Sequence, residues 1–353
     1  MERIGEYLVR RLVGEGGMGK VYEAEERLSK RRVALKVLKP ELTRSEEGRR
    51  LFLNEMQILA HLEHPALVRS LASFEDDGRL VMVLEYLQGR TLREELTRRG
   101  AMPWTVAVEH VVKIAEALAV THEQEPPIVH RDLKPENVML LVGEGAADDA
   151  PPTGLKVMDF GVAKVLEGAH ATNTQSVGTL QYMSPEQVDA RPIDARSDLY
   201  ALGLLFYEML AGDPPFTSAS PRELLNMQCT ATPPPLAPEV RRGLPRGVED
   251  LLFSMLEKEP KHRPRDAREV LERLAPFRAA EESAAPARTT AHPSRRNDAA
   301  TRGPEAASRG PEAASASRPS DAREPSRSPA APRDEAPKER PRTDTIQLVE
   351  QGE

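Results

Sequence analysis

The chain has 353 residues and a formal net charge of −7, with 49 Lys and Arg against 56 Asp and Glu. This length suits a two-lobed domain with additional sequence better than one small core, and the negative balance argues against nucleic acid as a general partner. The single cysteine, Cys229, excludes an internal disulfide framework and suits a reducing compartment. The N-terminus lacks a signal-peptide pattern, and the most apolar stretch, 201–210, is too short for a membrane helix. We therefore expect a soluble, cytoplasmic protein with no membrane span.

The first part of the chain, residues 1–86, is patterned mainly as strands. Apolar residues alternate over 33–38, which is typical of a strand with one buried face, and 80–84 forms a second short apolar strand. Thr43 and Glu46 have the spacing of a capping box, and apolar residues at helical spacing follow. These patterns predict a sheet-rich lobe with one helix.

The next part, residues 87–278, is patterned mainly as helices. Apolar residues recur every three to four positions over 108–119, and 198–210 is apolar nearly all round, as a buried central helix would be. The proline-rich stretch 233–238 is expected to be a loop. This segregation predicts an α+β fold with two lobes, the first β-rich and the second α-helical.

The composition changes sharply after residue 278. Residues 279–353 contain no Phe, Tyr or Trp and are dominated by Ala, Pro, Arg, Ser and Glu. A segment with so little apolar surface cannot offset the entropy lost on ordering, so we predict a disordered tail. The tandem heptapeptide RGPEAAS, at 302–308 and 309–315, is too short to indicate a repeat fold.

A glycine-rich stretch near the N-terminus fits the pattern GxGxxGxV. A dinucleotide site of this type would open a helix, whereas the residues after Val21 continue as a strand. A strand–loop–strand lid over phosphates therefore fits better, because glycine lets the backbone approach a polyphosphate closely. Lys36, in the middle of a predicted strand, is either a solvated lysine or, paired with Glu55 from the next helix, a cation directed at phosphates.

Two further motifs carry the chemistry of phosphoryl transfer. Residues 130–137 read HRDLKPEN and place Asp132, Lys134 and Asn137 in one short loop, and Asp159 opens the motif DFG. Together they supply a base, a phosphate contact and two oxygen ligands suited to Mg²⁺. Each residue alone fits a turn or a cap equally well, but the combination indicates a phosphoryl-transfer site.

Residues 7–277, with these motifs in order, resemble a eukaryotic-type (Hanks-type) protein kinase, and GEGGMGKVYEA and GTLQYMSPEQ are similar to bacterial Ser/Thr kinases. The resemblance implies a two-lobed protein-kinase fold, with ATP and Mg²⁺, or Mn²⁺ in its place, as cofactors. It implies that Lys36 pairs with Glu55, that Asp132 is the catalytic base assisted by Lys134, and that Asn137 and Asp159 bind metal. It also implies that the residues contacting ATP are Gly14, Glu15, Gly16, Gly17, Met18, Gly19, Val21, Ala34, Lys36, Leu84, Glu85, Leu87 and Met139.

The resemblance also implies a substrate class and a regulatory mechanism. Lys134 and Thr179 match the Ser/Thr form, so the expected acceptor is a serine or threonine hydroxyl of a protein, and Glu136 would favour a basic residue upstream of it. Glu186 is expected to pair with Arg263. The candidate autophosphorylation sites lie in the activation loop: Thr172, Thr174 and Ser176, with Arg131 as the expected phosphate receiver.

Three expectations concern partners and surface segments. Thr343 and Thr345 each precede an aliphatic residue by three positions, which resembles a phosphothreonine ligand of a forkhead-associated domain; an ordinary ragged terminus is the alternative. A kinase-domain homodimer follows from family analogy alone. Residues 142–154 interrupt the motif region and are expected to be a surface excursion with both ends held by paired strands.

Two other classes of function remain open. A pseudokinase scaffold would need a broken site, yet the sequence keeps Lys36, Asp132, Asn137 and Asp159. A small-molecule phosphotransferase shares the general layout but is not expected to carry the segment from Thr179 to Glu186, which serves a protein acceptor.

Overall fold

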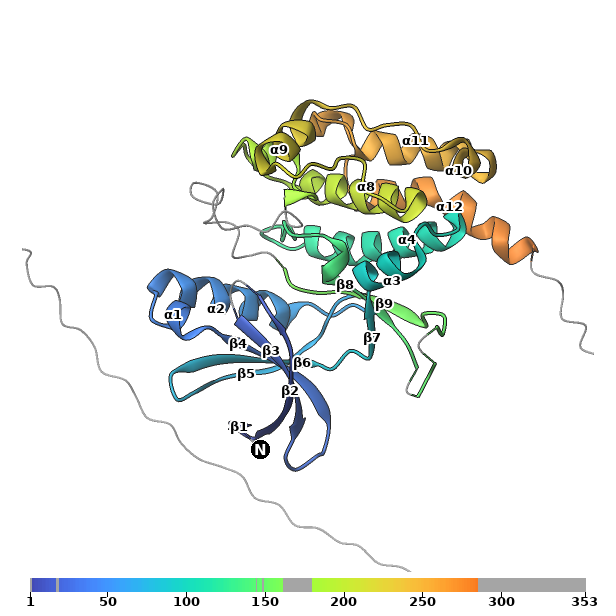
Figure 1. Cartoon of the computed structure of the whole chain (residues 1–353). Helices are drawn as coiled ribbons and strands as arrows, with labels where there is room; N and C mark the ends of the chain where they lie inside the picture. Colours follow the sequence, from blue (N-terminus) through green and yellow to red (C-terminus); the bar gives the residue numbers. More distant parts are fainter. Residues whose placement is uncertain (1, 17–18, 144, 148, 161–179, 285–353) are drawn as a thin grey trace, which may run out of the picture. The chain divides into compact units, whose positions relative to one another are not determined.

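The computed structural model describes residues 2–16, 19–143, 145–147, 149–160 and 180–284, with side chains through 278. These residues belong to one compact unit, Met1–Arg288. Figure 1 shows a sheet-rich lobe formed by the N-terminal part and a helical lobe formed by the rest. Nearly all of the predicted tail, 279–353, lies outside the described residues.

The N-terminal lobe is built on a six-stranded antiparallel sheet of order β1-β2-β3-β4-β6-β5. Its strands are β1 (Arg3–Ile4), β2 (Tyr7–Glu15), β3 (Gly19–Glu26), β4 (Arg32–Leu38), β5 (Ser70–Asp76) and β6 (Arg79–Glu85). The predicted alternation is confirmed, because Val33, Leu35 and Val37 are all buried in a small core on one face of β4. Lys36 therefore points to the opposite face, where α2 packs.

The helices of this lobe are α1 (Pro40–Thr43) and α2 (Glu46–His61). The predicted capping box of Thr43 and Glu46 is wrong. Ser45 is the N-cap and its hydroxyl accepts from Gly48 N at 3.2 Å, while the Thr43 hydroxyl donates to Lys39 O. Thr43 instead ends the short helix α1, and α2 begins after Ser45.

The C-terminal lobe opens with a small antiparallel sheet of order β7-β8-β9 and continues as helices. Its elements are β7 (Gly89–Thr91), α3 (Leu92–Arg99), α4 (Trp104–His122), η1 (Pro135–Asn137), β8 (Val138–Leu141), β9 (Gly154–Val157), α7 (Pro185–Val188), α8 (Ala195–Ala211), α9 (Pro221–Thr230), α10 (Pro238–Gly243), α11 (Arg246–Met255), η3 (Pro260–His262) and α12 (Ala267–Ala284). The predicted central helix is confirmed as α8, which is buried continuously over 197–210 and packs against α4 and α11. No helix among the described residues is long and apolar enough to cross a membrane.

The excursion over 142–154 leaves β8 and returns in β9, as expected. Val142 N donates to Gln88 O at 3.0 Å, and Thr153 N donates to Leu141 O at 2.9 Å. Two arginines near α3 also hold the excursion, since Arg90 donates to Ala150 O and Arg99 donates to Asp149 O. These contacts attach the excursion to the C-terminal lobe.

Candidate active site

Lys36 lies between two carboxylates from opposite lobes. Its Nζ donates to Glu55 Oε1 at 2.6 Å and to Asp159 Oδ1 at 3.0 Å. Glu55 comes from the buried stripe of α2, and Asp159 follows β9. The contact expected between Lys36 and Glu55 is present, and the contact with Asp159 links the DFG motif to the sheet.

Lys36, Glu55 and Asp159 shift one another's pKa values. Burial alone would lower the pKa of Lys36, but the charges of Asp159 and Glu55 outweigh burial and raise it. Lys36 in turn holds the pKa of Asp159 below its usual value, whereas burial raises the pKa of Glu55. Lys36 is therefore a fixed cation, and Asp159, whose side chain is 46% exposed, is a carboxylate accessible to a ligand.

Asp132 is held at the start of the loop that contains η1. Lys134 Nζ donates to its Oδ2 at 3.0 Å, and the Asn137 amide nitrogen donates to its backbone oxygen at 2.7 Å. Met158 N donates to Asn137 O at 2.8 Å, which places Asp159 beside this loop. Because its amide nitrogen is engaged, Asn137 offers its amide oxygen as a ligand atom.

Asp198, in α8 (Ala195–Ala211), holds the backbone of the loop that carries Asp132. We did not predict this role from the sequence. Its two carboxylate oxygens accept from the backbone nitrogens of His130 at 2.7 Å and Arg131 at 2.8 Å, and His122 Nε2 lies 2.8 Å away. Arg131 has φ = 65°, a left-handed conformation that needs support from the surroundings. The sequence did contain a signal for this role, because Asp198 interrupts the apolar pattern of α8 and a buried acid needs a hydrogen-bond partner.

The backbone at Asp159 is also left-handed, with φ = 52°. Phe160, 2% exposed, packs beside the His130 ring at a centroid distance of 4.7 Å, and His130 Nε2 lies 3.0 Å from Met158 O. Packing and hydrogen bonding therefore hold Asp159 in a conformation that an isolated aspartate rarely adopts.

The glycines of the N-terminal loop differ in what surrounds them. A Cβ at Gly19 would lie 2.3 Å from Val37 O, so the packing of β3 on β4 requires glycine there. Among the described residues, a Cβ at Gly14 or Gly16 would meet nothing within 4 Å. Packing within this part of the chain therefore does not explain these two glycines, which agrees with a surface that a ligand approaches closely.

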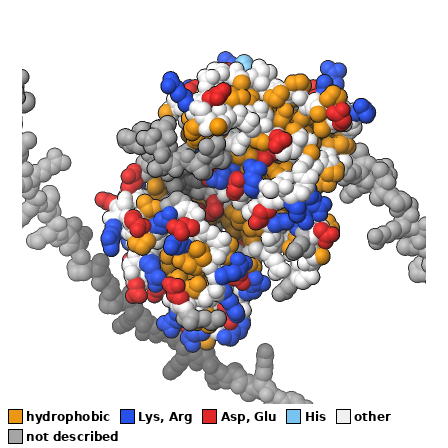
Figure 2. Space-filling model, in the orientation of Figure 1, with side chains coloured by type: hydrophobic (Ala, Val, Ile, Leu, Met, Phe, Trp, Pro, Cys, Tyr) orange, Lys and Arg blue, Asp and Glu red, His pale blue; other side chains and the backbone are white. Residues whose placement is uncertain are grey.

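The residues expected around adenine lie in β3, β4, β6 and β8. Val21 pairs with Lys36 across β3 and β4, and Ala34 pairs with Leu84 across β4 and β6. Met139, in β8, is half-buried and pairs with Lys156 of β9. Figure 2 shows the surface hollowed between the two lobes, with side chains of both charges along the hollow.

The segment joining the lobes begins at Glu85. Its carboxylate accepts from Lys156 Nζ at 2.6 Å and from Arg69 N at 2.8 Å, so a contact with adenine would fall to its backbone. Leu87 is half-buried and packs against the main core.

The expected pair of Glu186 and Arg263 is present and bidentate. Arg263 Nη1 and Nη2 donate to the two oxygens of Glu186 at 2.7 and 2.8 Å, and the Arg263 side chain is fully buried. Ser184 caps α7 in a capping box with Gln187, whose side chain also donates to Arg131 O at 2.9 Å. The segment after the activation loop is thereby tied to the catalytic loop.

A second missed group is centred on Arg93 of α3. Its guanidinium contacts Glu136, Glu208 and Tyr182, which come from η1, α8 and the segment before α7. No motif marks Arg93, because the contact depends on how α3 packs.

Several predicted residues lie outside the described part of the chain. They are Gly17, Met18, Gly161, Thr172, Thr174, Ser176, Thr179, Thr343 and Thr345.

The donor atoms suit a hard divalent cation that a nucleotide helps to bind. The described residues contain no group of three or more His, Cys, Asp or Glu side chains that could hold a metal ion alone. Asn137 and Asp159 offer oxygen ligands from adjacent segments. Mg²⁺ is commonly held by one or two protein ligands together with phosphates and water, and this set fits that pattern.

The comparisons with known proteins agree with this geometry. The protein kinase domain family matches residues 7–274. Serine/threonine-protein kinase PknB of Mycobacterium tuberculosis is 35% identical over 79% of this chain and 44% of its own length, and PrkC of Bacillus subtilis is 34% identical over 75% and 39%. Pkn2 of Myxococcus xanthus is 36% identical over 81% and 34%.

A solved structure of the M. tuberculosis PknI kinase domain, a double mutant, has a TM-score of 0.58 at 26% identity and covers 78% of this chain and 96% of that one. The chain spans less than half the length of the curated relatives named above. The match over residues 7–274 and the two-lobed fold show that this chain belongs to the protein kinase family.

Proposed function

We propose that this chain transfers the γ-phosphoryl group of ATP to serine or threonine hydroxyls of proteins. The observation that carries the proposal is the meeting of Lys36, Glu55 and Asp159 beside a loop that holds Asp132, Lys134 and Asn137. Phosphoryl transfer depends mainly on positioning and on charge stabilisation, and these groups supply both.

Each side chain has a defined task in this proposal. Lys36, held by Glu55, binds the α- and β-phosphates, and the loop over 14–19 covers them with backbone N–H groups. Asp132 orients the acceptor hydroxyl and takes its proton, while Lys134 neutralises charge that develops on the transferred group. Asn137 and Asp159 would hold Mg²⁺, or Mn²⁺ in its place, and the ion would supply positive charge to the phosphates. The adenine ring lies among Val21, Ala34, Leu84, Met139 and the backbone from Glu85 to Leu87.

The regulatory part of the proposal rests on sequence. We assign the lobe boundary to residues 86 and 87, autophosphorylation to the segment 172–176, and a phosphothreonine-reading partner to the C-terminal threonines. Arg131, next to the base, supports a phosphate-dependent ordering of that segment. A kinase-domain homodimer and a cytoplasmic location complete the proposal. Mass spectrometry of ATP-treated protein tests the phosphosites, and loss of partner binding after deletion of 343–353 tests the tail.

The central experiment measures transfer of labelled phosphate from ATP. Asp132→Asn and Asp159→Asn should each abolish transfer to protein, because one loses the base and the other a metal ligand. Asp77→Asn is the matched control, since Asp77 is exposed in the β5–β6 turn with φ = 48°, a conformation that asparagine also tolerates. Retained transfer in both site variants would overturn the proposal in favour of a scaffold. Transfer to metabolites but not to proteins would favour a small-molecule phosphotransferase.

A further inference from the structure

Arg93 uses three nitrogens on three partners from three segments. Nε donates to Glu136 Oε1 at 2.9 Å, Nη1 to Glu208 Oε1 at 2.5 Å, and Nη2 to the Tyr182 hydroxyl at 2.6 Å. The Tyr182 hydroxyl also donates to Glu208 Oε2. The planar guanidinium is suited to this arrangement because its donors point in fixed directions.

The two carboxylates differ in burial, and Glu208 in particular needs a cation, because the Glu136 side chain is 42% exposed. The Glu208 side chain is only 2% exposed, and a buried carboxylate without a partner is costly. Glu136 Oε2 is buried and has no hydrogen-bond partner among the described residues. The two carboxylates therefore share the guanidinium of Arg93, and together they form a binding site for a guanidinium group.

This group lies at the edge of the proposed acceptor site. Glu136 immediately precedes Asn137, whose amide contacts Asp132. An extended peptide advances about 3.3 Å per residue, so residues two or three positions from the acceptor reach about 7–10 Å from it. The side chain of such a residue would fall in the neighbourhood of Glu136.

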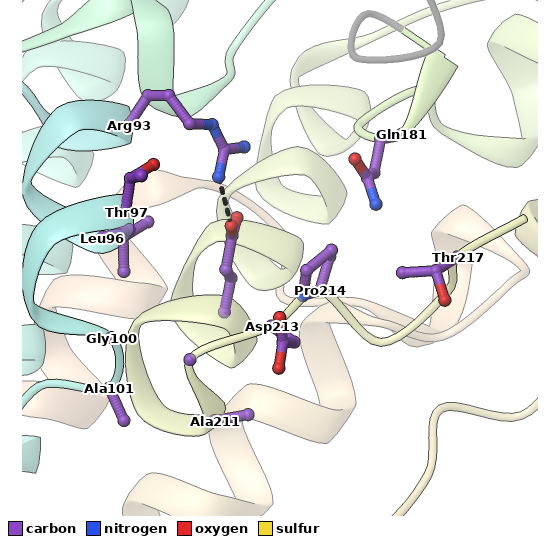
Figure 3. Close-up of a pocket in the computed structure, with 12 residues that line it drawn as sticks. Arg93, Leu96, Thr97, Gly100, Ala101, Gln181, Ala211, Asp213, Pro214 and Thr217 are labelled. Carbon is purple, nitrogen blue, oxygen red and sulfur yellow. Dashed lines mark hydrogen bonds and ion pairs between the residues drawn. The ribbon is translucent and has the colours of Figure 1, made fainter. Parts of the chain in front are cut away.

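There is also space beside Arg93. A pocket of about 590 Å³ adjoins it, with Arg93 and Leu96 projecting from α3 on one side and Gln181 and Thr217 on the other (Figure 3). The dashed contact in Figure 3 is the ion pair of Arg93 with Glu208. Glu208 also lines this pocket, so a peptide side chain can approach its carboxylate if the Arg93 side chain is absent.

We propose that Arg93 is a specificity-determining residue that occupies, from within the chain, the carboxylate pair that would otherwise select a basic residue in the substrate. The inference rests on the proposed protein kinase function. The native enzyme then has no requirement for a basic residue near the acceptor, contrary to the expectation that Glu136 selects one. Removal of the Arg93 guanidinium creates that requirement.

The test compares acceptor peptides that differ by one arginine. Each peptide carries a single Arg in place of Ala at one position within five residues of the acceptor, on either side. For the native chain, kcat/KM with Arg and with Ala should agree within about threefold at every position. For Arg93→Ala, at least one position should favour Arg by about tenfold or more, the effect of about 1.4 kcal/mol from a regained charge-assisted contact.

Control variants separate this effect from loss of structure. Arg99→Ala removes another arginine of α3, which pairs with Glu95 at 2.9 Å. In this variant the ratio of kcat/KM for the Arg peptide to kcat/KM for the Ala peptide should stay near one. Adding Glu136→Gln to Arg93→Ala should reduce the acquired preference. If Arg93→Ala does not fold, Arg93→Gln keeps hydrogen bonds but removes the charge, and it should show the same gain.

Two results would overturn the inference. One is a native enzyme that already prefers arginine at any tested position. The other is a folded, active Arg93→Ala or Arg93→Gln variant whose ratio stays near one throughout. A native chain that phosphorylates no protein at all would instead refute the proposed function.

Discussion

The ion pair of Glu186 and Arg263 allows a stability prediction of definite size. Glu186→Gln keeps the shape of the side chain but leaves the Arg263 guanidinium, which is fully buried, without a counter-charge. Breaking a buried pair from one side costs about 3–5 kcal/mol. The backbone oxygens of Glu257, Lys258 and Arg196 still accept from Arg263, so we expect the lower end of this range.

Urea denaturation followed by circular dichroism measures this cost. Asp250→Asn is the control, because the pair of Asp250 with Arg246 is 3.9 Å long and both side chains are more than 60% exposed. An exposed pair of this kind is worth about 0–1 kcal/mol. Equal losses of unfolding free energy in Glu186→Gln and Asp250→Asn would refute the reasoning.

The same pair makes stability depend on pH. Arg263 lowers the pKa of Glu186 despite burial, so the stabilisation from the ion pair is present above pH 4.5 and is lost as the pH falls further. Glu186→Gln should not show this loss of stability in acid.

Three more predictions follow from the site and its surroundings. Burial lowers the pKa of His110 to about 4, so the unfolded chain takes up the proton first and stability should fall between about pH 6.5 and pH 4; His110→Leu should flatten this part of the unfolding profile. Gly19→Ala should cost about 1–3 kcal/mol through its clash with Val37 O, whereas Gly16→Ala should leave the unfolding midpoint unchanged and raise KM for ATP; the reverse result would contradict the packing argument. Lys36→Met should lower kcat about 10²–10³-fold, with native circular dichroism, and a kcat within threefold of the native value would exclude its role at the phosphates.

The motif residues could be found from the sequence because each motif lies in one short segment. Lys36 and Glu55 pair as the resemblance to protein kinases implied, and Asp159 joins them from the DFG motif. The start of α2 was mispredicted because Thr43 and Ser45 are both good caps and only the turn of α1 decides between them.

Residues whose role depends on tertiary packing were missed. Arg93 carries no motif, and its three partners are distant in sequence, so only the packing of α3 against η1 and the reach of the guanidinium to α8 reveal the contact. Ser184 caps α7, a role that we did not predict. Its capping box with Gln187 follows Ser-x-x-Gln spacing, which is visible in the sequence.

Helix α8 explains how these separate contacts form one site. Nearly every residue of α8 over 197–210 is buried, so each polar side chain on it must find a partner inside the lobe. Ser197 donates to Glu186, Asp198 accepts from the backbone of the catalytic loop, and Glu208 pairs with Arg93. The apolar surface of the helix fixes its position in the core, and its few polar groups then fix the segments around it. The positions of Glu186, of the backbone at His130 and of the Arg93 side chain therefore depend on contacts with one buried helix.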